Sequence, residues 1–434
     1  MNKTKGMARF WWALVIFGLT GQVAWVVENM YFNVFLYEMF HASAEAISAM
    51  VGASAVSATM TTLLIGALSD KVGRRKAFIC GGYILWGLSI AAFALIRVDY
   101  LSVLFPTVSA AALGVTFTII LDCLMTFFGS SANDAAFNAW LTDSTDHSNR
   151  GAAEGINAMM PLMAILVVFG GFMSFDLSLA SSWTTIFLLI GGVVILIGVL
   201  GTFLIKDTAV CIPENKHYFR NIIYGFRPAV VKANPILYAT LIAFAVFGIS
   251  IQIFMPYLIL YYQVSLQMEN YVLIMAPAII LASVATAFYG RLYDRVGFGR
   301  SIAPALSLLM LGYLLLYLCR GTALVFIGSL LMMTGYLAGM AVFGAMLRDY
   351  TPENKAGMFQ GLRIVAQVLI PGVIGPAIGA AVLKNADTVQ NSDGTVSFIP
   401  NANIFLAAGV AALLVWISLL LVSRARKREV ADET

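Results

Sequence analysis

Gly66-Ala67-Leu68-Ser69-Asp70-Lys71-Val72-Gly73-Arg74-Arg75-Lys76 is a charged stretch that occurs twice in this chain. Its second copy is Gly290-Arg291-Leu292-Tyr293-Asp294-Arg295-Val296-Gly297-Phe298-Gly299-Arg300, so both read G-x-L-x-D-[KR]-V-G-x-x-[KR]. Each copy lies between two long apolar runs. Residues further along also recur, with Phe137, Asp143 and Gly151 returning as Phe343, Asp349 and Gly357. This duplication indicates two related halves of one membrane protein.

The composition is that of a protein whose solvent is lipid. Apolar residues make up 60% of the chain and charged residues only 11%. A run of about 18 apolar residues or more is long enough to cross a bilayer as a helix. We count twelve such runs, near 10–37, 45–69, 76–97, 112–142, 151–175, 182–205, 234–263, 270–290, 301–319, 322–347, 357–383 and 402–422. Strand alternation is absent from these runs, so the sequence predicts an all-α integral membrane protein with twelve transmembrane helices.

The basic residues predict the topology, because Lys and Arg gather on the cytoplasmic side of membrane proteins. With both termini in the cytoplasm, only Arg97, Arg320 and Lys384 of the 26 basic residues fall outside. We therefore expect a protein of the cytoplasmic membrane with cytoplasmic N- and C-termini. The first apolar run is too long for a cleavable signal peptide and should remain as the first helix.

Two six-helix bundles are expected, over residues 1–206 and 234–434, with a polar cytoplasmic linker at 207–233. From Gly66 to Phe137 is 71 residues and from Gly290 to Phe343 is 53, so the first half carries 18 more. We place this surplus on the outer side, near 98–115. It could be an interfacial piece, a re-entrant piece or an extension of a helix.

Several classes of function are disfavoured by what the sequence lacks. No basic patch with interleaved aromatic residues predicts binding to nucleic acid. The four cysteines have no metal-ligand spacing, so neither a zinc site nor a disulfide framework is expected. No sequence motif of nucleotide hydrolysis, of a metalloprotease or of nucleophilic catalysis occurs, and this weakens the hypothesis of a membrane enzyme or receptor. We expect no cofactor, no metal and no obligatory protein partner.

Asp134 is the first candidate for a functional group. It lies nine residues inside Asp143, which at 1.5 Å per residue is about 13 Å and close to the midplane. An ionisable residue at that depth is costly and should face a cavity. The alternative is a structural pair with Arg363, for which Glu154 is the other reachable carboxylate.

Gln22 and Trp25 are three residues apart in the first helix and share a face. An amide beside an indole suits a sugar, whose hydroxyls need hydrogen bonds and whose C–H face stacks on aromatic rings. Alternatively, Trp25 faces lipid and Gln22 bonds a neighbouring helix. Glu28 could take up protons, close an external gate or be a solvated helix-end charge.

Arg363 lies about 10 Å inside Ala356 by helical rise, with Gln367 one turn deeper. A guanidinium at that depth needs a carboxylate partner. Asp122, near the outer end of the fourth helix, receives no role. Other cavity candidates, each open to a reading as ordinary packing, are Asn138, Asn157, Gln252, Tyr257 and Tyr261.

Twelve spans in a doubled arrangement with G-x-L-x-D-[KR]-x-G-[RK]-[RK]-[RK] after the second span resemble the major facilitator superfamily. Within it, the stretches 21–28, 69–79 and 133–140 are similar to the glycoside-pentoside-hexuronide cation symporters, the group of melibiose permease and the sucrose/proton symporters. The resemblance implies cation and sugar binding at Asp134 and sugar binding at Gln22. Ala58 and Thr62 stand where melibiose permease has sodium-binding carboxylates, and Gln367 where it has a lysine. These departures from the family pattern disfavour coupling to sodium and favour coupling to protons.

The doubled loops are expected to act as a latch for the outward-open state, as the superfamily resemblance implies. The residues concerned are Gly66, Asp70, Gly73, Arg74, Arg75, Asp294 and Gly297. Arg74, Arg75 and Lys76 are expected to contact anionic lipid, and Gly73 and Gly297 to permit tight turns.

Taken together, the sequence predicts a secondary transporter that moves a sugar or glycoside by alternating access, with membrane lipids as its surroundings. A first alternative is a transporter or exporter of the same fold with a non-sugar small solute. A second is an uncoupled facilitator.

Overall fold

The computed structural model describes residues 2–72, 74–145, 149–206, 224–268, 270–351, 356–391 and 394–433. The chain forms two compact units, one of Met1–Ala46 with Ala53–Lys216 and one of Ile47–Gly52 with His217–Thr434. Within these residues, twelve helices are long and apolar enough to cross a membrane, which confirms the predicted fold class. Most of the predicted linker at 207–233 lies outside the described residues, so the predicted domain boundaries stay a prediction.

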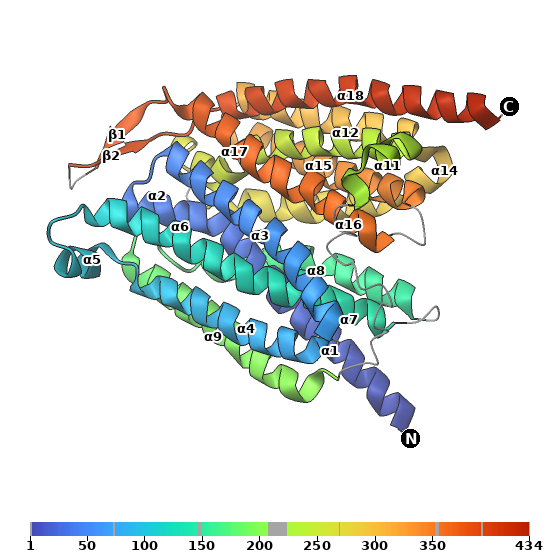
Figure 1. Cartoon of the computed structure of the whole chain (residues 1–434). Helices are drawn as coiled ribbons and strands as arrows, with labels where there is room; N and C mark the ends of the chain where they lie inside the picture. Colours follow the sequence, from blue (N-terminus) through green and yellow to red (C-terminus); the bar gives the residue numbers. More distant parts are fainter. Residues whose placement is uncertain are drawn as a thin grey trace. The chain divides into compact units, whose positions relative to one another are not determined.

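The first unit, coloured blue to green in Figure 1, is built from long helices that are apolar over most of their length. Within it, α4 packs along α9, and α1 packs along α8. Aromatic side chains such as Phe35, Trp183 and Phe187 fill its interior. Its helical segments are α1 (Asn2–Val26), η1 (Val27–Tyr31), α2 (Phe32–Phe40), α3 (Ala44–Val72), α4 (Arg75–Ala92), η2 (Phe93–Leu95), α5 (Val98–Leu104), α6 (Ala110–Gly129), η3 (Ser130–Phe137), α7 (Asn138–Asp143), α8 (Arg150–Phe172) and α9 (Ala180–Leu204).

The second unit is also built from long helices, in which α12 packs along α17 and α18, and the two parts of α14 pack with α15. Phe244, Phe247 and Phe343 stack in its core. Its segments are η4 (Tyr224–Phe226), α11 (Pro228–Ala233), α12 (Pro235–Phe254), η5 (Met255–Tyr257), α13 (Leu258–Leu260), η6 (Tyr261–Ser265), α14 (Val272–Leu318), α15 (Thr322–Tyr350), α16 (Ala356–Ile364), η8 (Val365–Leu369), α17 (Ile370–Leu383), β1 (Thr388–Gln390), β2 (Val396–Phe398) and α18 (Asn403–Glu433).

The helix α14 contains two candidate spans, Val272–Tyr289 and Arg291–Leu318, and it is kinked at Gly297, near the start of the second. The φ of Gly297 is +72° and its ψ is 179°, a conformation that a side chain would make costly. The sequence predicted a tight turn here, and the glycine does supply one. The second copy of the doubled loop therefore contains a real kink.

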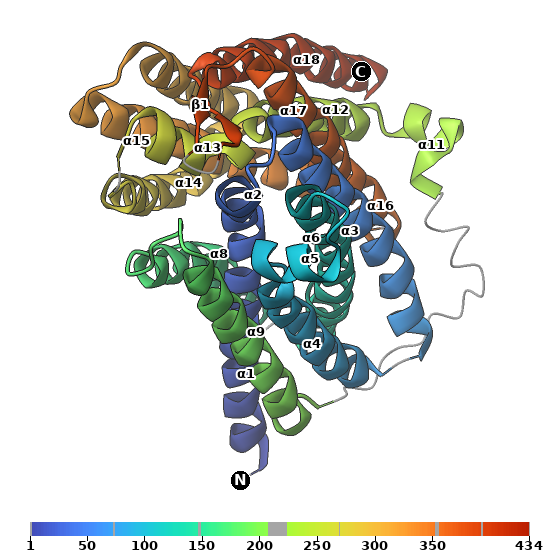
Figure 2. The ribbon, with the colours of Figure 1, turned by 90° about the vertical axis from the view of Figure 1, so that its left-hand side faces the viewer.

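The surplus of the first half forms a separate short helix, α5, near the N-terminal end of α6 (Figure 2). A turn containing Pro106 follows it, and Ser109 then caps α6 by accepting a hydrogen bond from the Ala112 amide. Apart from Leu101, the side chains of α5 are largely exposed. The second unit instead has a small antiparallel hairpin, in which Thr388 pairs with Phe398, before α18. The sequence analysis did not predict this hairpin.

Candidate functional site

In the part of the chain that the structure describes, four of the spans contain a π-helical segment, and each segment holds a residue singled out from the sequence. Glu28 lies in η1, Asp134 in η3 and Gln367 in η8. Tyr261 begins the fourth, η6. A π-helical turn carries one extra residue per turn and is often found at functional sites. The segments therefore re-aim polar side chains in the middle of otherwise regular spans.

Glu28 is the centre of a buried polar cluster in the first unit. Its side chain is 7% exposed, and Oε1 accepts hydrogen bonds from Ser54 Oγ at 2.6 Å and from Thr126 Oγ1 at 2.9 Å. The Ser54 and Thr126 oxygens are themselves 2.8 Å apart. Glu28 is thus a packed, interior group and not a solvated charge at a helix end.

Asp122 lies in the same cluster, one helical turn before Thr126 on α6. It is 1% exposed and interacts electrostatically with Glu28. Asp122 Oδ1 and Glu28 Oε2 have no hydrogen-bond partner within the described residues. Neither carboxyl group forms an ion pair in that part of the chain. Two acidic groups therefore share one buried site without a basic partner.

Asp134 is half-buried in η3, one turn after Ser130. Ser130 Oγ donates to Asp134 Oδ2 at 3.0 Å, and Asn138 Nδ2 donates to the Asp134 backbone carbonyl at 3.1 Å. The Trp25 indole lies beside the Asp134 carboxyl group, but its Nε1 has no hydrogen-bond partner among the described residues. Trp25 packs against the buried Trp86, with ring centroids 4.9 Å apart. It therefore faces the interior of this unit.

Gly21 brings this part of α1 close to η3. A Cβ atom added at Gly21 would lie 1.6 Å from Asn133 Nδ2. Asn133 donates to Tyr83 Oη at 3.0 Å, and Tyr83 donates to the Phe17 carbonyl at 2.9 Å. The glycine thus lets a hydrogen-bonded chain join three spans, next to the half-buried Gln22.

The candidates in the second unit are engaged with their own unit. Tyr257 is fully buried and donates to the Pro376 carbonyl at 3.3 Å, while Tyr261 donates to the Leu316 carbonyl. Arg363 Nε donates to Gln367 Oε1 at 3.2 Å. Both carboxylates expected to pair with Arg363, Asp134 and Glu154, belong to the first unit, and the Glu154 side chain lies outside the described residues. That pair stays a prediction.

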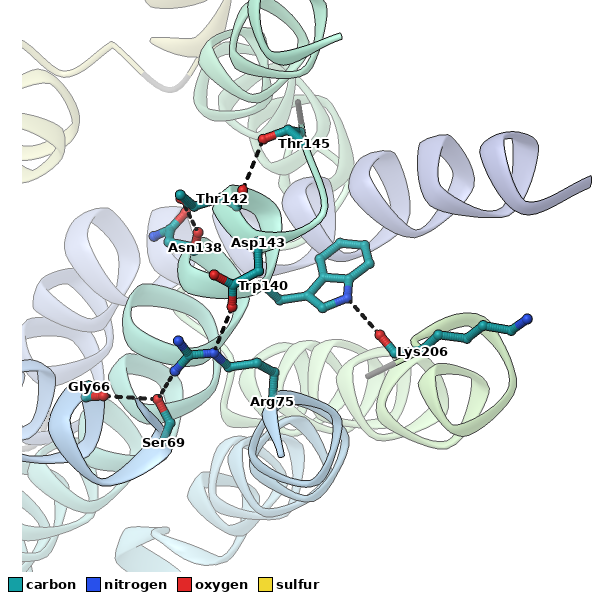
Figure 3. Close-up of polar contacts among 9 residues, drawn as sticks. All are labelled: Gly66, Ser69, Arg75, Asn138, Trp140, Thr142, Asp143, Thr145 and Lys206. Atoms are coloured by element: carbon teal, nitrogen blue, oxygen red, sulfur yellow. Dashed lines mark hydrogen bonds and ion pairs between the residues drawn. The ribbon is translucent and has the colours of Figure 1, made fainter. Parts of the chain in front are cut away.

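Arg75 links the start of α4 to the ends of α3 and α7 (Figure 3). Its Nε donates to Asp143 Oδ2 at 3.1 Å, and its Nη1 donates to Ser69 Oγ at 2.6 Å. Ser69 in turn donates to the Gly66 carbonyl. The expectation that Arg75 contacts lipid is wrong, because its side chain is only 5% exposed and pairs inward. Arg74 is exposed, and the Asp70 side chain and Gly73 lie outside the described residues.

The second copy of the loop satisfies its carboxylate differently. Asp349, the counterpart of Asp143, accepts a hydrogen bond from the Tyr293 hydroxyl. Tyr293 stands in the place of Ser69, and Gly299 in the place of Arg75. Asp294 is exposed. The two copies therefore share a pattern of residues but not a pattern of contacts.

Sequence reasoning missed Ser54 and Thr126, and left Asp122 without a role. The four residues of the cluster come from separate stretches of the chain, and single hydroxyls in apolar spans are common. A usable signal did exist. Asp122 and Thr126 are four residues apart, so they share one helix face, and that face presents both a carboxylate and a hydroxyl. Only the packing of the helices adds Glu28 and Ser54 to it.

The family description "Major Facilitator Superfamily" matches residues 10–376. The chain belongs to this superfamily. The comparison with curated protein sequences found no match to this chain. Members of the superfamily are transporters that bind small molecules within the membrane, so this integral membrane protein is a transporter and not an enzyme.

Solved structures of transporters share its fold. A crystal structure of the nucleoside transporter NupG (D323A mutant) has a TM-score of 0.70 at 12% identity, covering 95% of this chain and 99% of that one. A bacterial homologue of the human lysosomal transporter Spinster, inward-facing and occupied, has a TM-score of 0.70 at 15% identity, covering 95% and 96%. The xylose transporter XylE from E. coli, partially occluded and inward open, has a TM-score of 0.64 at 14% identity, covering 96% and 97%. Such identities show the fold alone.

Proposed function

We propose that this transporter moves a sugar or glycoside by alternating access and couples the movement to protons, with Glu28 as the proton-binding group. The observation that carries the coupling is the buried cluster of Glu28, Asp122, Ser54 and Thr126. Buried carboxyl groups without a basic partner are costly when ionised. Protonation removes that cost.

A count of hydrogen atoms supports a proton at Glu28. Glu28 Oε1, Ser54 Oγ and Thr126 Oγ1 form three mutual contacts of 2.6 to 2.9 Å. Ser54 and Thr126 each supply one hydroxyl hydrogen, so an ionised Glu28 leaves one contact without a hydrogen. A proton on Oε1 supplies the third hydrogen: one hydroxyl then accepts from Oε1 instead of donating to it, and each of the three oxygens donates once and accepts once.

The titratable groups that face Glu28 are Asp122 with its neighbour Cys123 on α6, and Asp134 on η3. All of them are neutral or negative.

The sugar side of the proposal rests on the first unit and on the resemblance to the glycoside-pentoside-hexuronide symporters. Trp25, which is half-buried against Trp86, offers an aromatic face, and Gln22, Asp134 and Asn138 offer hydrogen-bonding groups. Aromatic surface with a few polar groups is the usual equipment of a sugar site. The sugar-binding roles expected from the sequence for Tyr257 and Gln367, in the second unit, stay predictions.

Uptake into protein-only liposomes tests both parts of the proposal. A panel of radiolabelled disaccharides and glycosides is offered with a proton gradient, a sodium gradient or none. We expect accumulation with the proton gradient alone. Glu28→Gln should reduce accumulation at least tenfold while leaving counterflow exchange of the same sugar intact, and Asp134→Asn should weaken sugar binding itself. Glu45→Gln, a matched change at an exposed glutamate, should leave both unchanged.

Each outcome bears on a named part. Accumulation that survives Glu28→Gln removes Glu28 as the coupling group, and accumulation driven by sodium overturns the choice of ion. Equal uptake with and without gradients indicates a facilitator. No uptake of any sugar, in protein that unfolds cooperatively on heating, overturns the proposed cargo and favours a non-sugar solute.

A further inference from the structure

A groove runs between two helices of the second unit, on α14 after its kink and on the C-terminal half of α18. We call it the arginine groove. It encloses about 550 Å³ and is lined by Gly299, Ile302 and Ala303 from α14 and by Leu419, Leu420 and Arg426 from α18. In Figure 1, α18 runs along this unit toward the end marked C, which is the end that carries Arg426.

The two ends of the arginine groove differ in chemistry. Trp416 and the leucines form an apolar wall, whereas Arg426 provides a cation at the other end, and the exposed Arg300 follows Gly299 there. Trp416 and Arg426 are ten residues apart on α18, so the wall is about 15 Å long at 1.5 Å per residue. A long apolar wall that ends in a cation fits a phospholipid, with an acyl chain along the wall and the phosphate of the headgroup at the cation.

The arginine groove is open because the second loop copy lacks the large side chain of the first. Gly299 stands where the first copy has Arg75, and a Cβ atom added at Gly299 would meet nothing within 4 Å. Ala303, one turn further on, is also small. On the α14 side, the groove is therefore lined by small residues opposite the leucines and Arg426 of α18, which leaves room for a ligand.

A second groove between the same two helices serves as a comparison. It is lined by Met310, Leu314 and Tyr317 from α14 and by Leu406, Gly409 and Leu413 from α18, and holds about 420 Å³. No charged side chain lines this apolar groove. Of these two grooves, as lined by described residues, the arginine groove alone combines an apolar wall with a cation.

We propose that the arginine groove binds one anionic phospholipid, with an acyl chain along Leu419 and Leu420 and the phosphate at Arg426. Basic pockets between transmembrane helices recognise acidic lipid headgroups in this way. A guanidinium can donate two parallel hydrogen bonds to a phosphate, so it holds the headgroup in a fixed orientation. The site is separate from the buried acidic cluster and does not depend on the proposed cargo or coupling ion.

Native mass spectrometry of the full-length protein, released from detergent and titrated with lipid, tests the proposal. Phosphatidylglycerol and phosphatidylcholine with identical acyl chains are compared, and the affinity ratio for the first bound lipid is measured. The wild type should bind phosphatidylglycerol about tenfold more tightly, which corresponds to about 1.4 kcal/mol. Arg426→Gln should reduce the ratio to within twofold of one, and Arg426→Lys should retain part of it.

Matched variants separate a defined groove from diffuse attraction. Gly299→Leu fills the arginine groove and should weaken binding of both lipids, whereas Gly409→Leu fills the apolar groove and should leave the ratio unchanged. Arg424→Gln removes an exposed arginine from the same helix but outside the groove lining, and should also leave the ratio unchanged. A wild-type ratio near one overturns the proposal. So does a ratio that Arg424→Gln lowers as much as Arg426→Gln, because binding would then be a property of the surface charge.

Discussion

At the scale of single residues, the candidate site of the first unit depends on a glycine, Gly21, which has no side chain. Gly21 permits α1 to approach η3 so closely that Asn133 can reach Tyr83, and Tyr83 in turn reaches the Phe17 carbonyl. These bonds hold the helix turns that carry Gln22, Trp25 and Asp134. The position of the polar residues is thus set by backbone approach as well as by their own contacts.

Gly21→Ala should therefore destabilise the protein. The new methyl group would overlap Asn133 Nδ2, and either the helices separate or the Asn133–Tyr83 hydrogen bond breaks. Overpacking of this kind costs about 2 kcal/mol, so we expect a lower midpoint of thermal unfolding in detergent. Gly81→Ala is the control, because a Cβ atom there meets nothing within 4 Å. Equal midpoints for the two variants would show that the close approach is absent.

The residues themselves were only partly predictable from the sequence. Asp134 and Trp25 could be chosen because depth along a helix follows from counting residues, and a charge at the midplane is rare. The partners of Glu28 could not be chosen, because Ser54 and Thr126 lie 26 and 98 residues away from it. Nothing in a local pattern specifies such a contact. The inward pairing of Arg75 was missed for the same reason.

At the scale of elements, the duplicated loops have diverged in how they hold a carboxylate at the end of a span. In the first unit a buried guanidinium pairs with Asp143, and in the second a tyrosine hydroxyl donates to Asp349. Loss of a buried arginine leaves its carboxylate partner without a counter-charge, whereas loss of a tyrosine hydroxyl removes a single hydrogen bond. The two copies should therefore respond differently to the loss of their donor.

Arg75→Gln should lower the free energy of unfolding by about 2 kcal/mol, less than the loss of a fully buried pair because Asp143 is 26% exposed. Tyr293→Phe should cost at most about 1 kcal/mol, since it removes one hydrogen bond between neutral and charged groups at a half-exposed position. Thermal unfolding of the two variants in the same detergent measures the difference. Arg74→Gln, at the exposed neighbour, should match the wild type, and a Tyr293→Phe cost equal to that of Arg75→Gln would contradict the asymmetry.

Regular elements were predictable where hydrophobicity decides them, and irregular ones were not. An apolar run of this length is hard to accommodate outside a membrane, so the twelve spans of the described residues could be located from the sequence. The π-helical segments η1 and η3 differ from α-helix by a single shifted hydrogen-bonding register, which leaves no compositional trace. The segment α5 was located as a surplus of residues, but its three alternatives differed only in packing. The hairpin β1–β2 did carry a signal, an Asp-Gly pair between short alternating stretches, that the apolar runs overshadowed.

At the scale of the whole molecule, the charge distribution predicts which way the chain crosses the membrane. The span Asn403–Arg426 of α18 has 24 residues, about 36 Å at 1.5 Å per residue, which is enough to cross the hydrocarbon core. The hairpin before α18 and the arginine-rich tail after it must therefore face opposite sides. Since Lys and Arg gather in the cytoplasm, we propose that the tail lies inside and the hairpin outside.

Single reporter cysteines test this orientation in intact cells, after the four native cysteines have been replaced by serine or alanine. Val389→Cys places a thiol on the exposed hairpin, and Arg424→Cys places one on the exposed face of the tail. A membrane-impermeant maleimide should label the hairpin thiol in intact cells and the tail thiol only after permeabilisation. The reverse pattern would invert the molecule and place the arginine groove in the outer leaflet. Its proposed lipid would then have to be sought on the opposite side of the membrane, because α18 fixes Arg426 to the same side as the tail.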